Sequence, residues 1–256
     1  MLQLFVGLCG LYFAFPFVCN QTDLELIVTR RATDWIFILL KVLPCVFLTF
    51  WVKSHSADLC KKTKGIFEKE EQEKIRLNAS AFCLSSFGDL CLAFKNTLSF
   101  PLGILGFSLA QICYVRSFGW QNVTRHLGMS LYFIAFINLA VIFGFHLTKE
   151  DSMQGLELYV TSFAVLIYCL LIYTAFWRSL DIKIHSTDTE NSSTDTLRCV
   201  GVGLFIISDT IIAVNKFCVT IPYAWIAIMG YYYLAQGLIA YSETNSFKNP
   251  RKEKII

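Results

Sequence analysis

The chain has 256 residues, of which 55% are hydrophobic and 16% are charged, and its mean hydropathy is +0.54. This composition lies well outside the range of soluble globular proteins and indicates a polytopic membrane protein. The net charge of +3 comes from Lys and Arg residues in short connectors rather than on an aromatic-rich face, which argues against nucleic acid as a partner.

Eight apolar stretches are long enough to cross a bilayer, which takes about 20 residues of helix. They cover residues 2–19, 34–52, 77–95, 100–120, 126–147, 156–177, 198–216 and 221–241. The first stretch lacks the basic start and the small-residue cleavage site of a signal peptide, so we count it as a span. The polar connectors 53–76 and 186–196 are predicted to be mobile linkers. The sequence therefore predicts one all-α transmembrane domain over 1–256, with eight transmembrane helices and a tail at 242–256.

Lys and Arg residues predict the orientation, because cytosolic loops carry an excess of them. The connectors after the second, fourth and sixth spans and the C-terminal tail hold sixteen, whereas the opposite connectors hold five. Both termini should therefore be cytosolic. The tail ends Lys252-Glu-Lys254-Ile-Ile, which resembles the dilysine signal that returns proteins to the endoplasmic reticulum membrane. The alternative is an ordinary basic tail.

The ten cysteines and four histidines do not suggest a metal site. The cysteines are scattered through apolar runs without a Cys-x-x-Cys pair, and we interpret them as small hydrophobic residues. The histidines, at positions 55, 126, 146 and 185, fall in or beside connectors and lack His-x-x-x-His spacing. We expect no metal and no cofactor.

Two aspartates lie inside predicted spans. Asp89 in the third span and Asp209 in the seventh are each about 11 or 12 residues from the cytosolic end, so their depths agree within roughly 2 Å. A carboxylate at the bilayer centre costs roughly 2.5–3.5 kcal/mol, which makes such a residue a candidate functional site. Lys41 in the second span lies near the same level. It is either a counter-ion or a lysine that extends its side chain to the membrane surface.

Each Asp-containing span is followed by a span with an Ala-Gln pair, Ala110-Gln111 and Ala235-Gln236. This pattern suggests an internal repeat of a two-span unit, as in many transporters, although coincidence explains it equally well. Polar residues of these helices either line a shared cavity or form interhelical hydrogen bonds of about 0.6 kcal/mol each. They are Gln111, Tyr114, Asn215, Tyr232, Tyr233 and Gln236.

Short motifs of aromatic, small and polar residues are spread over nearly the whole chain. They are Lys41-x-x-Pro44, Phe87-Gly-Asp89, Phe100-x-x-Gly103, Gly106-Phe-x-x-Ala110, Trp177-Arg178, Phe205-Ile-Ile-Ser-Asp209, Asn215-Lys-Phe217 and Tyr232-Tyr-x-Ala-Gln236. Together they resemble the lysoplasmalogenase (YhhN-like) family, above all its animal members. The resemblance implies an eight-span enzyme of the endoplasmic reticulum membrane. It would hydrolyse the vinyl ether bond of lysoplasmalogens to a fatty aldehyde and glycerophosphoethanolamine or glycerophosphocholine.

This chemistry gives the two aspartates a role. Vinyl ether hydrolysis begins with protonation of the alkene carbon, and water then traps the resulting oxocarbenium ion. Two buried carboxyl groups can share the work, one as the acid and one as the stabiliser of the cation, as in glycosidases. We expect Asp89 and Asp209 to form this catalytic pair, without assigning the donor. The predicted substrate-binding residues are Lys41, Gln111, Tyr114, Asn215, Lys216, Tyr232, Tyr233 and Gln236.

One position departs from the family pattern, which has His where this chain has Gln111. A Gln side chain forms hydrogen bonds but does not carry a proton at neutral pH. One alternative is therefore a catalytically weak, lipid-binding relative. Another is a proton-coupled lipid transporter, which the paired aspartates and the repeat favour. The head-group preference, and whether the chain forms a homodimer, stay open.

Overall fold

The computed structural model describes residues 2–20, 27–60, 68–94, 98–121, 123–148, 155–186 and 189–246. Within these ranges the chain forms eight α-helices and one π-helical turn, and no strand. The elements are α1 (Leu2–Asn20), α2 (Ile27–Cys60), α3 (Glu68–Ala93), α4 (Ser99–Phe118), α5 (Arg125–Leu147), α6 (Gly155–Ile184), α7 (Thr189–Ala213), η1 (Val214–Cys218) and α8 (Ala224–Ser246). The predicted all-α architecture is confirmed. Each predicted span falls on one helix, except that the seventh continues from α7 into η1.

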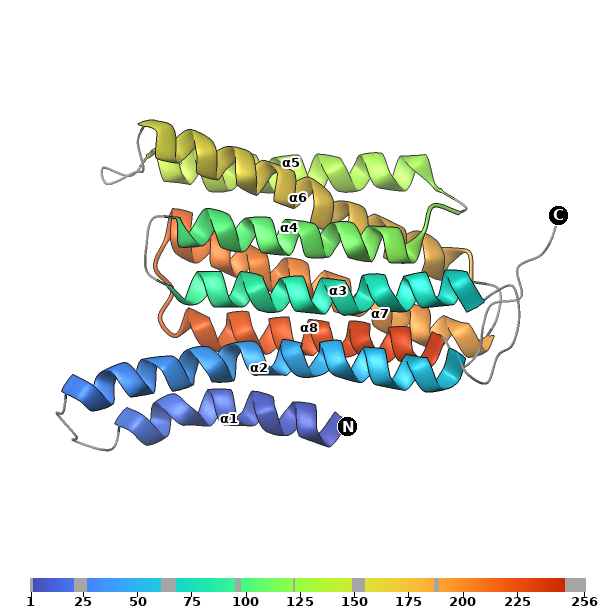
Figure 1. Cartoon of the computed structure of the whole chain (residues 1–256). Coiled ribbons are helices and arrows are strands. Elements are labelled where there is room, and N and C mark those ends of the chain that lie inside the picture. The colour runs from blue at the N-terminus through green and yellow to red at the C-terminus, as the bar shows by residue number, and fades with distance from the viewer. Residues whose placement is uncertain are drawn as a thin grey trace.

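The helices lie alongside one another in an elongated bundle (Figure 1). Its centre consists of the pairs α3–α4 and α7–α8, which make the most extensive contacts in the described chain. α2 packs on α3 and α8, and α6 packs on α4 and α7. α1 and α5 lie at opposite edges, against α2 and α6 (Figure 1). This arrangement places the two Asp-containing helices, α3 and α7, in the interior.

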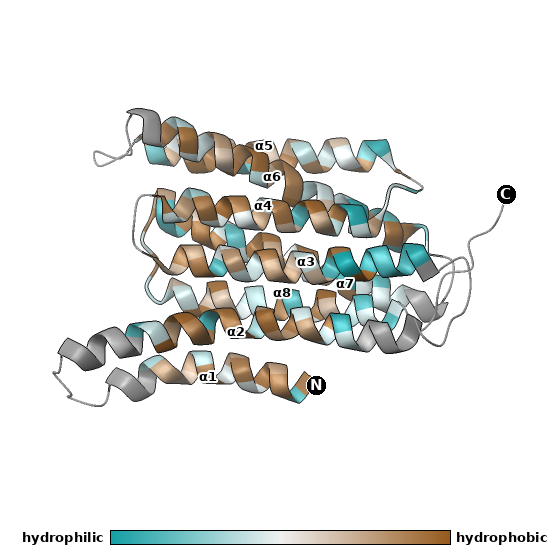
Figure 2. Cartoon of the chain, in the orientation of Figure 1, coloured by the Kyte–Doolittle hydropathy of each residue, from teal (hydrophilic) through white to brown (hydrophobic). Residues whose placement is uncertain are grey.

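Four stretches of the described chain are long and apolar enough to cross a membrane. They are Asp34–Ser54, Arg125–Leu147, Leu158–Ile184 and Ser192–Cys218. Large apolar side chains project from them, such as Phe136, which is 67% exposed, and Phe163, which is 65% exposed. Hydrophobic residues recur along these helices (Figure 2), and exposed apolar side chains in such numbers suit contact with lipid. The chain is therefore a multi-pass membrane protein.

Within the described residues, α3, α4 and α8 do not meet the same criterion of length and hydropathy, and α1 contributes the shorter apolar stretch Leu2–Pro16. α3 begins with the charged segment 68–76, which appears as a hydrophilic end in Figure 2. α8 carries Gln236 and Glu243, and both are buried against other helices. A helix that faces protein on most sides can carry polar groups without exposing them to lipid. Of the eight-span prediction, the eight helices are confirmed, and four of them contain a clear candidate membrane span.

The prediction of mobile linkers at 53–76 and 186–196 is wrong for the described parts of both. α2 continues to Cys60 and α3 begins at Glu68, while α7 begins at Thr189. Lys, Glu and Gln are good helix formers, so the helices extend past their apolar parts. α8 likewise continues to Ser246, beyond the predicted start of the tail. The dilysine-like Lys252 and Lys254 lie outside the described residues.

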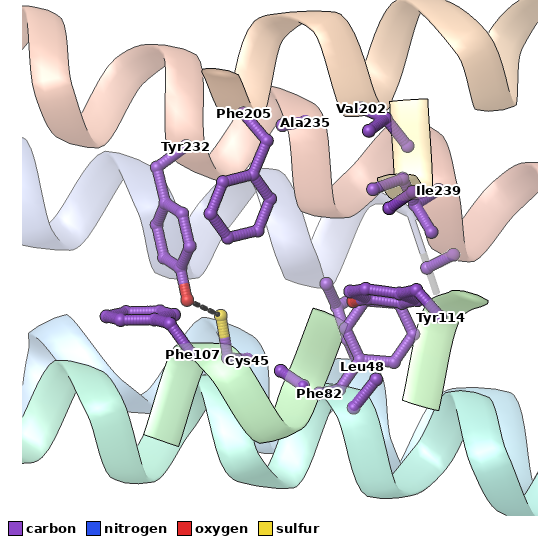
Figure 3. Close-up of a cluster of buried hydrophobic side chains, with 14 of the residues drawn as sticks. Cys45, Leu48, Phe82, Phe107, Tyr114, Val202, Phe205, Tyr232, Ala235 and Ile239 are labelled. Carbon is purple, nitrogen blue, oxygen red and sulfur yellow. Dashed lines mark hydrogen bonds between the residues drawn. The ribbon is translucent and has the colours of Figure 1, made fainter. Parts of the chain in front are cut away.

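Glycines allow α3 and α4 to approach closely. A Cβ atom at Gly88 would lie 2.8 Å from the Phe107 ring, and one at Gly106 would lie 3.0 Å from the Gly88 nitrogen. Small residues permit this kind of backbone contact between membrane helices. The close approach brings α3 near the centre of the bundle. Figure 3 shows part of the resulting core, formed by Cys45, Leu48, Phe82, Phe107, Tyr114, Val202, Phe205, Tyr232, Ala235 and Ile239.

Candidate active site

Asp89 is a buried carboxylate with several partners. It is 2% exposed, and the Tyr232 hydroxyl donates a hydrogen bond of 2.6 Å to its Oδ2. The Lys41 ammonium lies 3.9 Å from its Oδ1 and donates to its main-chain oxygen at 3.3 Å. The Cys45 sulfur lies 3.2 Å from the Tyr232 hydroxyl, as Figure 3 shows. Lys41 is thus the counter-ion of Asp89 in this structure.

Helix α8 holds this arrangement from two adjacent positions. Tyr232 contacts Asp89, while the Tyr233 hydroxyl donates a hydrogen bond of 2.8 Å to the Lys41 main-chain oxygen. Phe107 and Phe205 pack against the Tyr232 ring, with centroid distances of 6.0 and 5.3 Å. Aromatic contacts of this kind restrict the ring, so they fix the direction of its hydroxyl. Helices α2, α3 and α8 therefore meet at Asp89.

Asp209 lies in a different environment. Its carboxyl group accepts a short hydrogen bond from the Tyr168 hydroxyl of α6. It also lines a cavity of about 100 Å³, bounded mainly by α4, α5, α6 and α7. The polar lining residues are Asn138, Tyr168, Tyr173, Asp209 and Thr210, and the others are apolar or cysteine. Among the described residues, no cation forms an ion pair with Asp209.

Phe107 forms the cavity wall on the Asp89 side. Its ring lines the cavity and also packs on Tyr232, the hydrogen-bond donor of Asp89. Asp89 itself does not belong to the described lining. The two carboxyl groups are near enough to interact electrostatically. The structure therefore brings the aspartates into one region of the bundle, but only Asp209 faces the cavity.

The two glutamines lie inside the bundle and do not line the cavity. Gln236 is fully buried and accepts a hydrogen bond of 2.8 Å from the Tyr114 hydroxyl. Gln111 is 1% exposed and lies beside the Tyr168 hydroxyl. The amide nitrogens of both glutamines are buried without a hydrogen-bond partner. Gln111 therefore adjoins the Tyr168–Asp209 pair, while Gln236 and Tyr114 tie α8 to α4.

The last two predicted residues, Asn215 and Lys216, lie on η1. The Asn215 side-chain oxygen accepts a hydrogen bond of 2.8 Å from the Ile221 main-chain nitrogen, which holds the turn into α8. The Lys216 ammonium lies 4.3 Å from the centroid of the Phe100 ring. Phe100 and Phe217 both line the cavity, whereas Lys216 itself is exposed and does not line it.

Sequence reasoning missed Tyr168, the hydrogen-bond partner of Asp209. Tyr168 and Tyr173 stand in an otherwise apolar run and are part of no motif noted above. A single tyrosine is common in a membrane helix, so no sequence signal separates this one from others. Within the described residues, no cluster of three or more His, Cys, Asp or Glu side chains is arranged to hold a metal ion.

Comparison of the amino-acid sequence with known proteins identifies its family. Residues 36–243 match the family model described as the YhhN family. The match begins within α2 and ends in the last turn of α8. The chain belongs to the YhhN family. All the residues of the candidate site named above lie within the matched region of this YhhN-family chain, whereas α1 lies outside it.

Several curated relatives of this YhhN-family chain are similar over most of their length. Lysoplasmalogenase TMEM86A of Homo sapiens is 26% identical over 214 residues, covering 83% of this chain and 80% of the relative. Lysoplasmalogenase TMEM86B of Sus scrofa is 28% identical over 215 residues, covering 84% and 78%. The TMEM86B protein of Rattus norvegicus is 26% identical over 251 residues, covering 94% and 83%. No solved structure matches the chain.

Proposed function

We propose that this chain is a lysoplasmalogenase. It hydrolyses the vinyl ether bond of lysoplasmalogens to a fatty aldehyde and glycerophosphoethanolamine or glycerophosphocholine. The observation that carries the proposal is the Asp209 carboxyl group, held by Tyr168 and facing a largely apolar cavity inside the bundle. Membership of the YhhN family and similarity to proteins named lysoplasmalogenases support it.

In this proposal all eight helices cross the endoplasmic reticulum membrane as a single domain, with both termini in the cytosol. Five helix ends extend beyond the predicted spans on the predicted cytosolic side: the ends of α2, α6 and α8 and the starts of α3 and α7. The charged start of α3 lies at one end of the bundle (Figure 2). The α3–α4 and α7–α8 pairs at the centre suit an internal repeat.

Asp209 is the proposed acid. Asp209 is half-buried beside a largely apolar cavity and has no cation partner among the described residues, which favours the neutral carboxylic acid in the resting state. The carboxylic acid donates its proton to the alkene carbon farther from the ether oxygen, which leaves an oxocarbenium ion centred on the carbon bonded to that oxygen. Water adds to that carbon and returns a proton to Asp209. The hemiacetal then breaks its bond to the glycerol oxygen, which takes up the hydroxyl proton, and the aldehyde is released.

Asp89 is the proposed stabiliser of the cation. Its ion pair with Lys41 and its hydrogen bond from Tyr232 suit a carboxylate that stays ionised. From behind the Phe107 wall its negative charge opposes the positive charge that develops at the substrate carbon. Preorganised charge of this kind acts strongly in a medium of low dielectric constant. The carboxylates therefore have separate roles, and only Asp209 contacts the substrate.

The proposal is tested by incubating the purified chain in detergent with a defined 1-alkenyl lysophospholipid. Fatty aldehyde and the glycerophospho head group should appear in equal amounts. The saturated 1-alkyl analogue is the matched control, because it lacks the double bond that accepts the proton, and it should release nothing. Binding of the 1-alkenyl lipid without aldehyde would instead identify a lipid-binding relative. Lipid flux across liposomes without aldehyde would identify a transporter.

A further inference from the structure

His146 is a buried imidazole without a hydrogen-bond partner. It is 5% exposed, and neither of its ring nitrogens is bonded. It lies in the last turn of α5, one turn beyond Ile142, which lines the cavity. Buried polar groups are nearly always satisfied, so a histidine with two free nitrogens points to a ligand that the structure does not contain.

His146 shares a neighbour with Lys216, an exposed lysine of η1. Its ring packs edge-on against Phe217, with the centroids 5.4 Å apart. The Lys216 ammonium lies 5.9 Å from the centroid of the same Phe217 ring and 4.3 Å from that of Phe100. Among the described residues, no carboxylate pairs with Lys216. Neither side chain lines the cavity itself, but both contact Phe217, which does. Among the described residues, this wall thus has beside it an imidazole and an ammonium group without an anionic partner.

We infer that His146 and Lys216 form an anion-binding subsite that receives the phosphate group of the lysophospholipid. This inference rests on the proposed function and adds to it the part of the site that recognises the head group. An imidazole N–H donates to a phosphate oxygen, and the ammonium supplies a charge-assisted hydrogen bond. The apolar walls between this subsite and Asp209 suit the uncharged part of the substrate.

The spacing along α7 and η1 agrees with the substrate. Lys216 follows Asp209 by seven residues, which corresponds to about 10 Å along a helix. In a 1-alkenyl lysophospholipid the phosphorus is seven bonds from the carbon that takes the proton, which spans roughly 8–9 Å when extended. A phosphate held by His146 and Lys216 therefore places the vinyl ether within reach of the Asp209 carboxyl group.

The test compares two substrates that differ only in the phosphate-bearing head group, a 1-alkenyl lysophospholipid and 1-alkenylglycerol. His146→Phe and Lys216→Met should each lower kcat/KM for the phospholipid about tenfold, mainly by raising KM, and should leave kcat/KM for alkenylglycerol unchanged. His146→Gln keeps an N–H donor and should retain part of the preference. The matched controls are His126→Phe at the other end of α5 and Lys183→Met on α6, both exposed. They should behave as the unaltered protein.

An equal loss for both substrates, or no loss for either, would overturn the subsite. A second measurement separates this outcome from failure of the proposed function. The dissociation constants of the uncleaved 1-alkyl lysophospholipid and 1-alkylglycerol are measured for the same variants. The unaltered protein and the variants could all fail to release aldehyde. In that case, tighter binding of the lysophospholipid than of the alkylglycerol, lost in His146→Phe and Lys216→Met, still supports the subsite. Equal binding of the two lipids by the unaltered protein rejects it.

Discussion

At the scale of single residues, Asp89 and Asp209 show how neighbours separate two identical side chains. Asp89 has a lysine, a tyrosine hydroxyl and a nearby thiol around it, whereas Asp209 has one tyrosine hydroxyl and a cavity. The cation partner favours the ionised form of a carboxyl group, and an apolar surrounding favours the neutral form. The two residues are therefore expected to respond differently to the same substitution.

Asp209→Asn should lower kcat for aldehyde release by about 10³-fold, because the amide cannot donate a proton to carbon. Asp89→Asn should have a smaller effect, about 10–100-fold, because it removes a stabilising charge and not the acid. The measurement is aldehyde release from a 1-alkenyl lysophospholipid in detergent. Asp34→Asn, at an exposed position on α2, is the matched control and should be neutral. Wild-type activity in Asp209→Asn would rule out the proposed acid.

Gln111→His should raise the rate of aldehyde release, by about tenfold if proton return to Asp209 limits turnover. The reason is its position beside the Tyr168 hydroxyl, where an imidazole could pass a proton that the amide cannot carry. Gln111→Asn is the control, because it keeps an amide and should give no gain. If the His and Asn variants have the same rate, position 111 takes no part in proton transfer.

At the scale of the elements, a buried ionic cluster joins three helices at the end of the bundle away from the cavity. Arg198 of α7 contacts Asp195 at 2.8 Å and Glu243 of α8 at 2.5 Å. Glu243 also accepts a hydrogen bond of 2.8 Å from Asn78 of α3. All four residues are at most 4% exposed. This cluster fixes α3, α7 and α8 relative to one another, and so positions the helices that carry Asp89 and Asp209.

Arg198→Met should destabilise the protein by about 3–5 kcal/mol, because it leaves the buried Glu243 and Asp195 without their cation. Chemical unfolding in detergent micelles measures the change. The matched control is Arg116→Met, which breaks the exposed ion pair between Arg116 and Glu73, where the side chains are 63% and 50% exposed. Exposed pairs contribute roughly 0–1 kcal/mol. Equal losses for the two variants would contradict a stabilising role for the buried cluster.

At the scale of the whole molecule, the bundle has two unlike ends. The charged starts of α3 and α7 and the ionic cluster lie at one end, and Lys216 and His146 lie at the other. Lys69, Lys74 and Arg76 of α3 lie at the first end, and cytosolic ends of membrane proteins are enriched in Lys and Arg, so this placement agrees with the proposed orientation. The proposed phosphate subsite then lies on the lumenal side of the candidate acid.

The double substitution Lys252→Ala and Lys254→Ala should release the chain from the endoplasmic reticulum to later compartments of the secretory pathway. The tail resembles a receptor-read retrieval signal, and such a signal needs both lysines on the cytosolic side. Microscopy of the full chain in cells measures its distribution. Lys248→Ala keeps the signal and should not move the protein. Unchanged retention of the double variant would contradict the proposed signal.

Several features of the site were predictable because they depend on position along the chain. The polar residues Asp89, Asp209 and Lys41 stand out against apolar runs, and counting along the helix placed them at matching depths. Tyr168 and His146 were not predictable as site residues, because their importance lies in what they contact or fail to contact. Of the two alternatives for Gln111, Tyr114 and Gln236, a shared cavity or interhelical hydrogen bonds, the Tyr114–Gln236 bond is an instance of the second, and none of the three lines the cavity at Asp209. Their role in substrate binding stays a prediction.

The sequence by itself determined the helical architecture, the matching depth of the aspartates and the family. Apolar runs of sufficient length must form helices in a membrane, because lipid offers no partners for main-chain N–H and C=O groups. Only the tertiary structure decided which helices touch. It therefore decided that Lys41 and Tyr232 contact Asp89, whereas Asp209 bonds to Tyr168 and lines the cavity. The physical reason is that helical rise sets depth, whereas lateral position depends on packing between segments far apart in the chain.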